Sequence, residues 1–165
     1  MNIKIIHLEK PPKEIKKEDI PHYSHMYYTD ILVKQLNTLY NTDEYDYIIL
    51  DRGWISEYVY APLYRNRTYE EVVEDNIVLD YKVSKIFGKQ NIYLYVLIGD
   101  TNFLLKHEDN LSLSKSNKNL INTEYNLFLS AFYMSLLPNK ETITVNDKGQ
   151  YKEYLPNIVN TIIEF

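Results

Sequence analysis

The chain has 165 residues, a net charge of −5 and an apolar fraction of 45%, which predicts one soluble domain with a hydrophobic core. It contains no cysteine and no apolar run of about 18 residues, so disulfides, thiolate metal sites, cysteine nucleophiles and a membrane-spanning helix are excluded. A negative charge without a large basic block argues against binding to duplex nucleic acid through its phosphates. The first residues show no signal-peptide pattern, and we expect a cytoplasmic protein.

Apolar periodicity predicts strands and helices that alternate along the chain. In order, we expect a strand at 2–8, a helix from 24 to about 41, a strand at 47–50, a short helix at 55–63, a helix from 68 to about 88, a strand at 92–98, a short helix or turn at 100–105, a polar loop at 108–119, a helix at 121–136, a strand at 142–145 and a helix at 155–163. Thr68 and Glu71 form a capping-box pattern, and the strand at 47–50 is interpreted as buried on both faces.

Helices between successive strands favour parallel pairing through right-handed crossovers. We therefore predict a single α/β domain over residues 1–165. Its expected architecture is a three-layer parallel sheet of about four strands with helices on both faces.

All the arginines of the chain, Arg52, Arg65 and Arg67, lie in one short segment, whereas every other basic residue except histidine is a lysine. A guanidinium can bind a planar or tetrahedral oxyanion through paired hydrogen bonds, which an ammonium group cannot do. The concentration of arginine in one segment therefore indicates a chemical demand for oxyanion binding.

Asp51 and Arg52 follow directly after the second predicted strand, and ligands of open α/β sheets bind beyond the carboxyl ends of strands. A carboxylate at this place can hold a magnesium ion or accept a proton, and the adjacent guanidinium can bind a phosphate. The alternative is that the pair ends the strand in solvent, or that Asp51 caps the following helix.

Aromatic residues follow the Asp-Arg pair at Trp54, Tyr58, Tyr60 and Tyr64. Aromatic faces beside phosphate-binding arginines are what nucleotide recognition requires. Trp54 and Tyr58 are also spaced for a buried helix face, and both interpretations can hold at once.

The stretch "DRGWISEYVYAPLYR" resembles the Asp-Arg strand end and substrate helix of the thymidylate kinase and deoxynucleoside kinase group of P-loop kinases, particularly its phage and viral members. "IIHLEKPP" is similar to the second strand of that fold with its following loop, "YLYVLIGD" to the fourth strand, and "ETITVND" is placed like the fifth. The loop at about 106–119 falls where the family has its mobile lid. The resemblance covers nearly the whole chain and implies a P-loop kinase-like fold that uses ATP and Mg²⁺.

The resemblance also implies roles for particular residues. Asp51 would be the catalytic carboxylate or the partner of Mg²⁺, and Arg52 would bind the acceptor phosphate or the group in transfer. Arg65 would contact substrate phosphate or, together with Glu57 and Tyr60, the sugar. The full set of implied substrate-binding residues is Trp54, Glu57, Tyr60, Tyr64, Arg65 and Arg67.

In the lid, Lys106, Lys115 or Lys118 would neutralise charge on the donor phosphates. The lids of the family usually carry arginine, so a solvated polar loop is the alternative interpretation of this segment. The histidines, including His107, form no metal-ligand spacing.

A P-loop kinase needs a glycine-rich turn followed by Lys and Ser/Thr. The glycines are Gly53, Gly88, Gly99 and Gly149, and none stands in the pattern G-x-x-x-x-G-K-[ST]. In the family the P-loop strand is central, so its absence would leave the strands at 47–50 and 92–98 flanking a gap. Either a P-loop-bearing segment, partner chain or homodimer fills this gap, or the two strand edges pair directly.

These observations predict the acceptor-binding part of a nucleoside or nucleoside-monophosphate kinase that transfers the γ-phosphoryl group of ATP if a P-loop is supplied. The alternative is a catalytically inactive nucleotide-binding pseudokinase or regulatory protein. In a third interpretation the arginines serve a protein interface.

Overall fold

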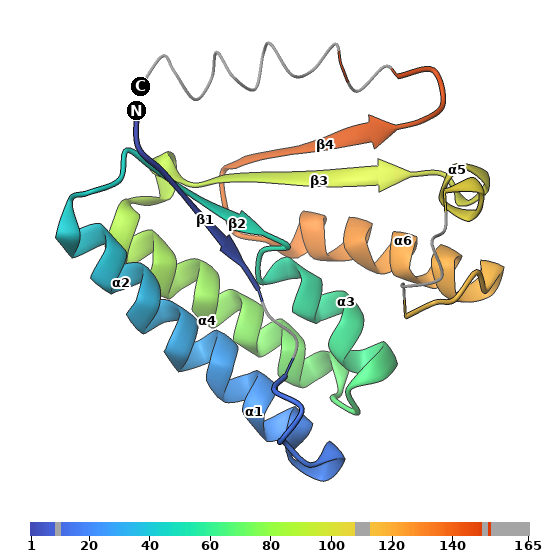
Figure 1. Ribbon diagram of the computed structural model, residues 1–165, viewed down its shortest axis with the longest axis horizontal. Helices are drawn as coiled ribbons and strands as arrows, with labels where there is room; N and C mark the ends of the chain where they lie inside the picture. The colour runs from blue at the N-terminus through green and yellow to red at the C-terminus, as the bar shows by residue number, and fades with distance from the viewer. Residues whose placement is uncertain (9–10, 108–112, 150–151, 153–165) are drawn as a thin grey trace.

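Two pairs of parallel strands and a set of helices on one side of them make up the fold (Figure 1). The computed structural model describes residues 1–8, 11–107, 113–149 and 152. The strands are β1 (Ile3–His7), β2 (Tyr47–Asp51), β3 (Tyr93–Gly99) and β4 (Asn139–Val145). The helices are α1 (Ile20–Met26), α2 (Leu32–Thr42), α3 (Ile55–Tyr64), α4 (Tyr69–Phe87), α5 (Thr101–Lys106) and α6 (Lys118–Met134).

Each strand pairs with one other strand. β1 pairs with β2 from Ile3↔Tyr47 to His7↔Asp51, and β3 pairs with β4 from Tyr93↔Asn139 to Gly99↔Val145. No pairing joins β2 to β3 among the described residues, and the arrows of these two strands point in different directions in Figure 1. The strands therefore form two two-stranded sheets.

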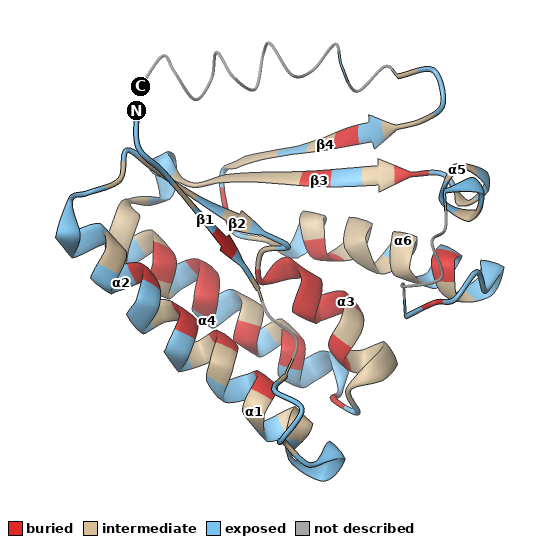
Figure 2. Cartoon of the chain, viewed as in Figure 1, coloured by how far each residue is buried: buried red, intermediate tan, exposed pale blue. Residues whose placement is uncertain are grey.

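The first core cluster lies where the α1–α2 segment packs on α4 and on β1. A π-helical turn at Tyr27–Ile31 joins α1 to α2, so the helix predicted from 24 to about 41 is confirmed and starts four residues earlier. Tyr28, Leu32 and Leu36 of its apolar stripe are buried against Leu79 of α4, because the 3.6-residue period keeps them on one face. Figure 2 shows buried segments where α2 and α4 face each other.

The second core cluster joins α3, α4 and α6 to β3. Val59 and Ala61 of α3 pack with Val72 of α4, Val96 of β3 and Ala131 of α6. α4 begins with the predicted capping box, in which the Thr68 side chain accepts a hydrogen bond from the Glu71 backbone and the Glu71 side chain accepts one from the Thr68 backbone. The helix boundaries thus follow local sequence signals closely.

The prediction of an α/β chain with parallel strands is confirmed, but the described residues do not form the expected four-stranded, three-layer sheet. Their long helices lie on one side of the strands in Figure 1. The interpretation of 47–50 as buried on both faces was wrong, because Ile49 is 43% exposed on the side away from α2 and α4. Periodicity identifies strands but does not reveal which strands find partners.

Two further predictions are affected by which residues are described. The helix expected at 155–163 lies outside the described residues. The lid-like loop expected at about 106–119 lies partly outside them, since residues 108–112 are not described. Of its remaining residues, Lys106 ends α5 and Lys118 begins α6. Among the described helices, none is long and apolar enough to cross a bilayer.

Candidate functional site

The carboxyl ends of β1 and β2 bring His7 and Asp51 together. Their register makes them partners across the pair, and His7 Nδ1 lies 2.8 Å from Asp51 Oδ2. The Leu8 backbone N–H donates to the Asp51 carbonyl at 3.3 Å and continues the ladder by one step. Both side chains are exposed, so the Asp51 carboxyl group is accessible to solvent at the sheet edge. Sequence reasoning missed His7, although its place at the end of a strand parallel to the Asp51 strand was a usable signal.

Arg52 occupies an unusual backbone conformation with φ of 64°, in the left-handed region that non-glycine residues rarely adopt. Its carbonyl accepts a hydrogen bond from Ser56 Oγ at 3.2 Å, which ties it to the first turn of α3. The chain thereby turns sharply from β2 into α3, and the exposed Arg52 side chain follows directly after Asp51.

A cleft of about 1560 Å³ lies between β2 and β3. Asp51, Arg52 and Tyr60 all line it, as do the buried Trp54 and Tyr58. The cleft lining does not include Glu57, Tyr64, Arg65 or Arg67. The structure therefore brings part of the predicted site together around one cavity and places the rest elsewhere.

Tyr60 lines the cleft and is also influenced by Arg65, which lies outside the lining. Burial and the negative charge of Glu124 raise its pKa, and the positive charges of Arg52 and Arg65 oppose this shift. The Tyr60 ring lies edge-on to Phe128 at 5.8 Å between centroids and 6.2 Å from the Tyr64 ring. Arg52 and Arg65 thus act on the same hydroxyl from different segments.

Tyr64 is held by α6. Its hydroxyl donates to Glu124 Oε1 at 2.5 Å. Burial and this hydrogen bond raise the pKa of Tyr64, since ionising the phenol would place two negative charges side by side. Glu124 was another residue that the sequence pattern did not single out.

Glu57, Arg65 and Arg67 belong to a buried ion network. Glu57 is 1% exposed and accepts hydrogen bonds from Ser24 Oγ and Arg65 Nη1. Arg67 Nη1 lies 3.6 Å from Glu57 Oε1, and Arg67 Nη2 donates to Asp75 Oδ2 at 2.6 Å. These charges neutralise one another inside the protein, so Glu57 and Arg67 position α3 rather than face the cleft.

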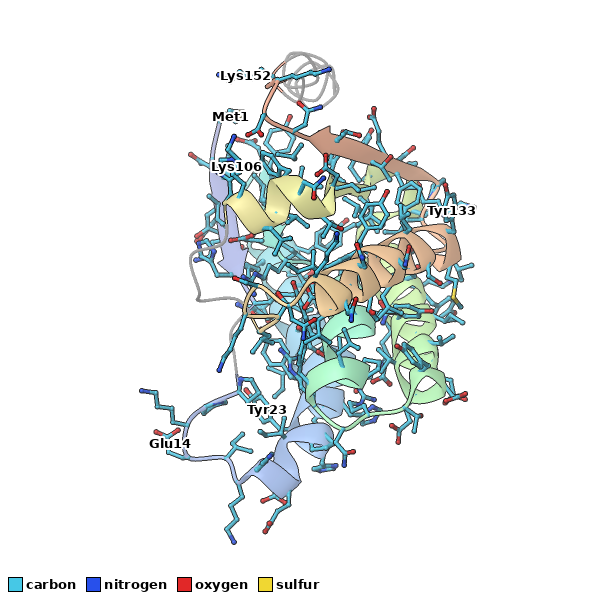
Figure 3. The ribbon with its side chains drawn as sticks, turned by 90° about the vertical axis from the view of Figure 1, so that its right-hand side faces the viewer. Met1, Glu14, Tyr23, Lys106, Tyr133 and Lys152 are labelled. Carbon is cyan, nitrogen blue, oxygen red and sulfur yellow. The ribbon has the colours of Figure 1, made fainter. Side chains whose placement is uncertain are left out.

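Lys106, the first of the predicted lid lysines, forms an exposed ion pair with Asp147. Lys106 Nζ donates to Asp147 Oδ2 at 3.0 Å, and His107 Nε2 lies 3.1 Å from Asp147 Oδ1. Figure 3 shows Lys106 towards the top of the molecule, whereas Tyr23 and Glu14 lie at the bottom. Lys115 has φ of 45° in the turn before α6. The structure brings none of these lysines into the cleft lining.

Hydrogen bonds from His107 and Lys106 hold the pKa of the Asp147 carboxyl below its ordinary value. We expect an NMR titration of Asp147 to show this depressed midpoint, and Lys106→Ala to move it upwards because a donor and a positive charge are lost. Lys34→Ala, at an exposed ion pair on α2, serves as the control. An unchanged midpoint in the Lys106 variant would contradict the assigned cause.

No group of three or more carboxylate or histidine side chains that could enclose a metal is found in the described part of the chain. Mg²⁺ commonly binds through one or two carboxylates together with substrate phosphates and water. The exposed Asp51 carboxylate fits that mode, since it would hold the ion jointly with a bound nucleotide.

Comparisons with protein-family models, with curated proteins and with solved structures found no match to this chain. The functional assignment therefore depends on the geometry of the cleft and on the sequence.

Proposed function

We propose that the chain is the acceptor-binding part of a nucleoside or nucleoside-monophosphate kinase of the thymidylate kinase-like type, acting in the cytoplasm. The observation that supports it is a single cleft lined by Asp51, Arg52 and Tyr60. Transfer of the ATP γ-phosphoryl group requires a P-loop from another segment or chain, because the glycines of this sequence do not form one.

Phosphoryl transfer depends mainly on positioning and on charge stabilisation, so it needs no covalent nucleophile. In this proposal Asp51 accepts a proton from the acceptor or holds Mg²⁺ that arrives with the nucleotide. Arg52 binds the acceptor phosphate or the group in transfer through its paired N–H donors. Tyr60 offers its ring to the base or sugar, and Arg65 contributes through its effect on Tyr60.

Binding of dTMP, thymidine and ATP, each measured by isothermal titration calorimetry with Mg²⁺, tests this proposal. We expect Arg52→Ala to weaken dTMP binding by about 10- to 100-fold, because a hydrogen bond to a charged group contributes about 1.5–3 kcal/mol. Thymidine binding should change less, since thymidine lacks the phosphate.

Lys34→Ala removes one positive charge from an exposed ion pair on α2 and is the matched control for net charge. Arg52→Lys should recover part of the affinity, because it restores the charge without the bidentate fork. Equal dTMP affinity in the wild type and Arg52→Ala would overturn the proposal, as would the absence of binding by all three ligands.

A catalytically inactive nucleotide-binding or regulatory protein is the second candidate, and the missing glycine-rich turn favours it. Both candidates bind an acceptor nucleotide without ATP. If turnover appears when a P-loop-bearing partner is added, that result supports only the first candidate, the kinase.

A further inference from the structure

One face of α4 carries a stripe of four exposed residues, Glu74, Val78, Tyr81 and Lys85. Their spacing of four, three and four positions keeps them on the same side of a helix. Val78 is 39% and Tyr81 61% exposed. None of the four belongs to a core cluster or to the lining of the cleft, so the stripe is a surface separate from the core and from the candidate site.

The two charged residues of the stripe have no partner within their own helix. Glu74 lies one turn before Val78, and Lys85 lies one turn after Tyr81. No residue three or four positions from either of them carries the opposite charge, although such pairs are what stabilise a single helix. Lys85 Nζ lies 5.2 Å from the centre of the Tyr81 ring instead. The helix dipole favours this order of charges, but it does not account for the two apolar side chains between them.

The stripe is complementary to a second copy of itself when the two helices run antiparallel. Its midpoint falls between positions 79 and 80, so Val78 of one copy faces Tyr81 of the other, and Glu74 faces Lys85. Each contact then occurs twice, as a twofold interface requires. A parallel pair would place Glu74 beside Glu74 and Lys85 beside Lys85, and like charges that face each other are unfavourable.

Leu136 extends the apolar surface beside the middle of the stripe. It is 64% exposed, and its backbone N–H donates to Asp80 Oδ2 at 2.7 Å, so it lies next to the turn of α4 that carries Tyr81. Tyr133, near the end of α6, is 73% exposed and lies on the same side of the molecule as α4 in Figure 3. Exposed apolar side chains that gather from two elements are typical of an interaction surface.

We propose that two copies of this chain associate through antiparallel α4 helices, with Val78, Tyr81 and Leu136 at the centre of the contact and an ion pair between Glu74 and Lys85 at each end. One helix pair is smaller than a standard interface, so the dissociation constant is expected on the order of 10–100 µM. The stripe lies outside the cleft lining, so this dimer leaves the cleft open and does not depend on nucleotide binding.

Sedimentation velocity of the full chain between about 5 and 500 µM tests the proposal across the expected dissociation constant. The experiment is done at about 20 mM salt, because higher ionic strength screens exposed ion pairs. We expect the mean sedimentation coefficient to rise with concentration from that of a monomer to that of a dimer.

Charge reversal tests the antiparallel pairing. Glu74→Lys places like charges at both ends of the contact and should weaken the dimer about tenfold or more. The double variant Glu74→Lys/Lys85→Glu exchanges the two charges and should recover wild-type association. Glu14→Lys makes the same change in net charge at an exposed position, on the opposite side of the view from α4 in Figure 3, and should dimerise like the wild type.

An apolar substitution tests the centre of the contact. Val78→Ser should weaken the dimer by about tenfold, because a twofold interface contains the substitution twice. Ile31→Ser is the control, since Ile31 has a similar exposure of 41% but lies on the π-helical turn between α1 and α2. It should leave association unchanged.

Three results would overturn the proposal. A chain that remains monomeric at the highest concentration would show that the stripe does not bind a second copy. A dimer that Glu74→Lys leaves unchanged would show that the helices are parallel or that another surface is used. A double variant as weak as Glu74→Lys would show that Glu74 and Lys85 do not face each other.

Discussion

Replacing Arg67 by alanine is expected to destabilise the protein by about 3–5 kcal/mol, the cost typical of removing one partner from a buried ion pair. The Arg67 side chain is 4% exposed and lies between Glu57 and Asp75, whose side chains are 1% and 7% exposed. Its removal leaves Asp75 without the 2.6 Å hydrogen bond from Nη2. It also takes a positive charge away from Glu57, which keeps its hydrogen bonds from Ser24 and Arg65, while Asp75 keeps only its contact with the half-exposed His25 at 2.9 Å.

Urea unfolding followed by circular dichroism measures this loss as a lower midpoint at an unchanged slope. Lys34→Ala is the control, because its ion pair with Asp30 at 2.8 Å is exposed, and such pairs contribute about 0–1 kcal/mol. A loss below about 1 kcal/mol for Arg67→Ala would show that the network does not contribute to stability as its geometry indicates.

Asp80→Ala is expected to cost about 3 kcal/mol or more, because three donors lose one acceptor and hydrogen bonds to charged groups contribute about 1.5–3 kcal/mol each. The buried Asp80 carboxylate accepts from Trp54 Nε1 at 2.8 Å, from Ser135 Oγ at 3.0 Å and from the Leu136 backbone at 2.7 Å. These bonds join α4 to the start of α3 and to the end of α6.

Trp54 is the single tryptophan of the chain, so its fluorescence reports on the same site. We expect Asp80→Ala to lower the thermal midpoint and to shift the Trp54 emission. Asp80→Asn keeps one side-chain oxygen as an acceptor, so its thermal midpoint should lie between those of the wild type and Asp80→Ala. Asp30→Ala removes an exposed aspartate of the π-helical turn that precedes α2 and should leave both signals unchanged. A wild-type midpoint in Asp80→Ala would refute the linking role of this carboxylate.

Local signals in the sequence predicted most helices and strands well. The stripe that begins at Tyr28 and the pairing of Thr68 with Glu71 are encoded within a few residues, so periodicity and capping chemistry suffice to find them. The four parallel strands also lie close to their expected positions. Strand pairing could not be predicted in the same way, because register and partners depend on contacts between distant segments.

Dependence on distant contacts also explains why the sequence placed some residues of the candidate site in the cleft and misplaced others. Asp51 and Arg52 follow a strand directly, and a strand end is a local feature. Glu57 was expected to contact substrate, but Ser24 and Arg67 approach it from other segments and enclose it. The burial of a charge depends on which distant residues surround it, and a single sequence shows only the charge.

The left-handed backbone at Arg52 shows that the residue best for folding at this position differs from the residue that is present. A glycine would adopt a φ of 64° without the steric penalty of about 1–2 kcal/mol that a side chain incurs there. The turn from β2 into α3 would therefore form more easily with glycine, and folding alone does not explain an arginine. The position therefore contributes a guanidinium to the residues that line the cleft, at a backbone conformation that would favour glycine if stability alone mattered.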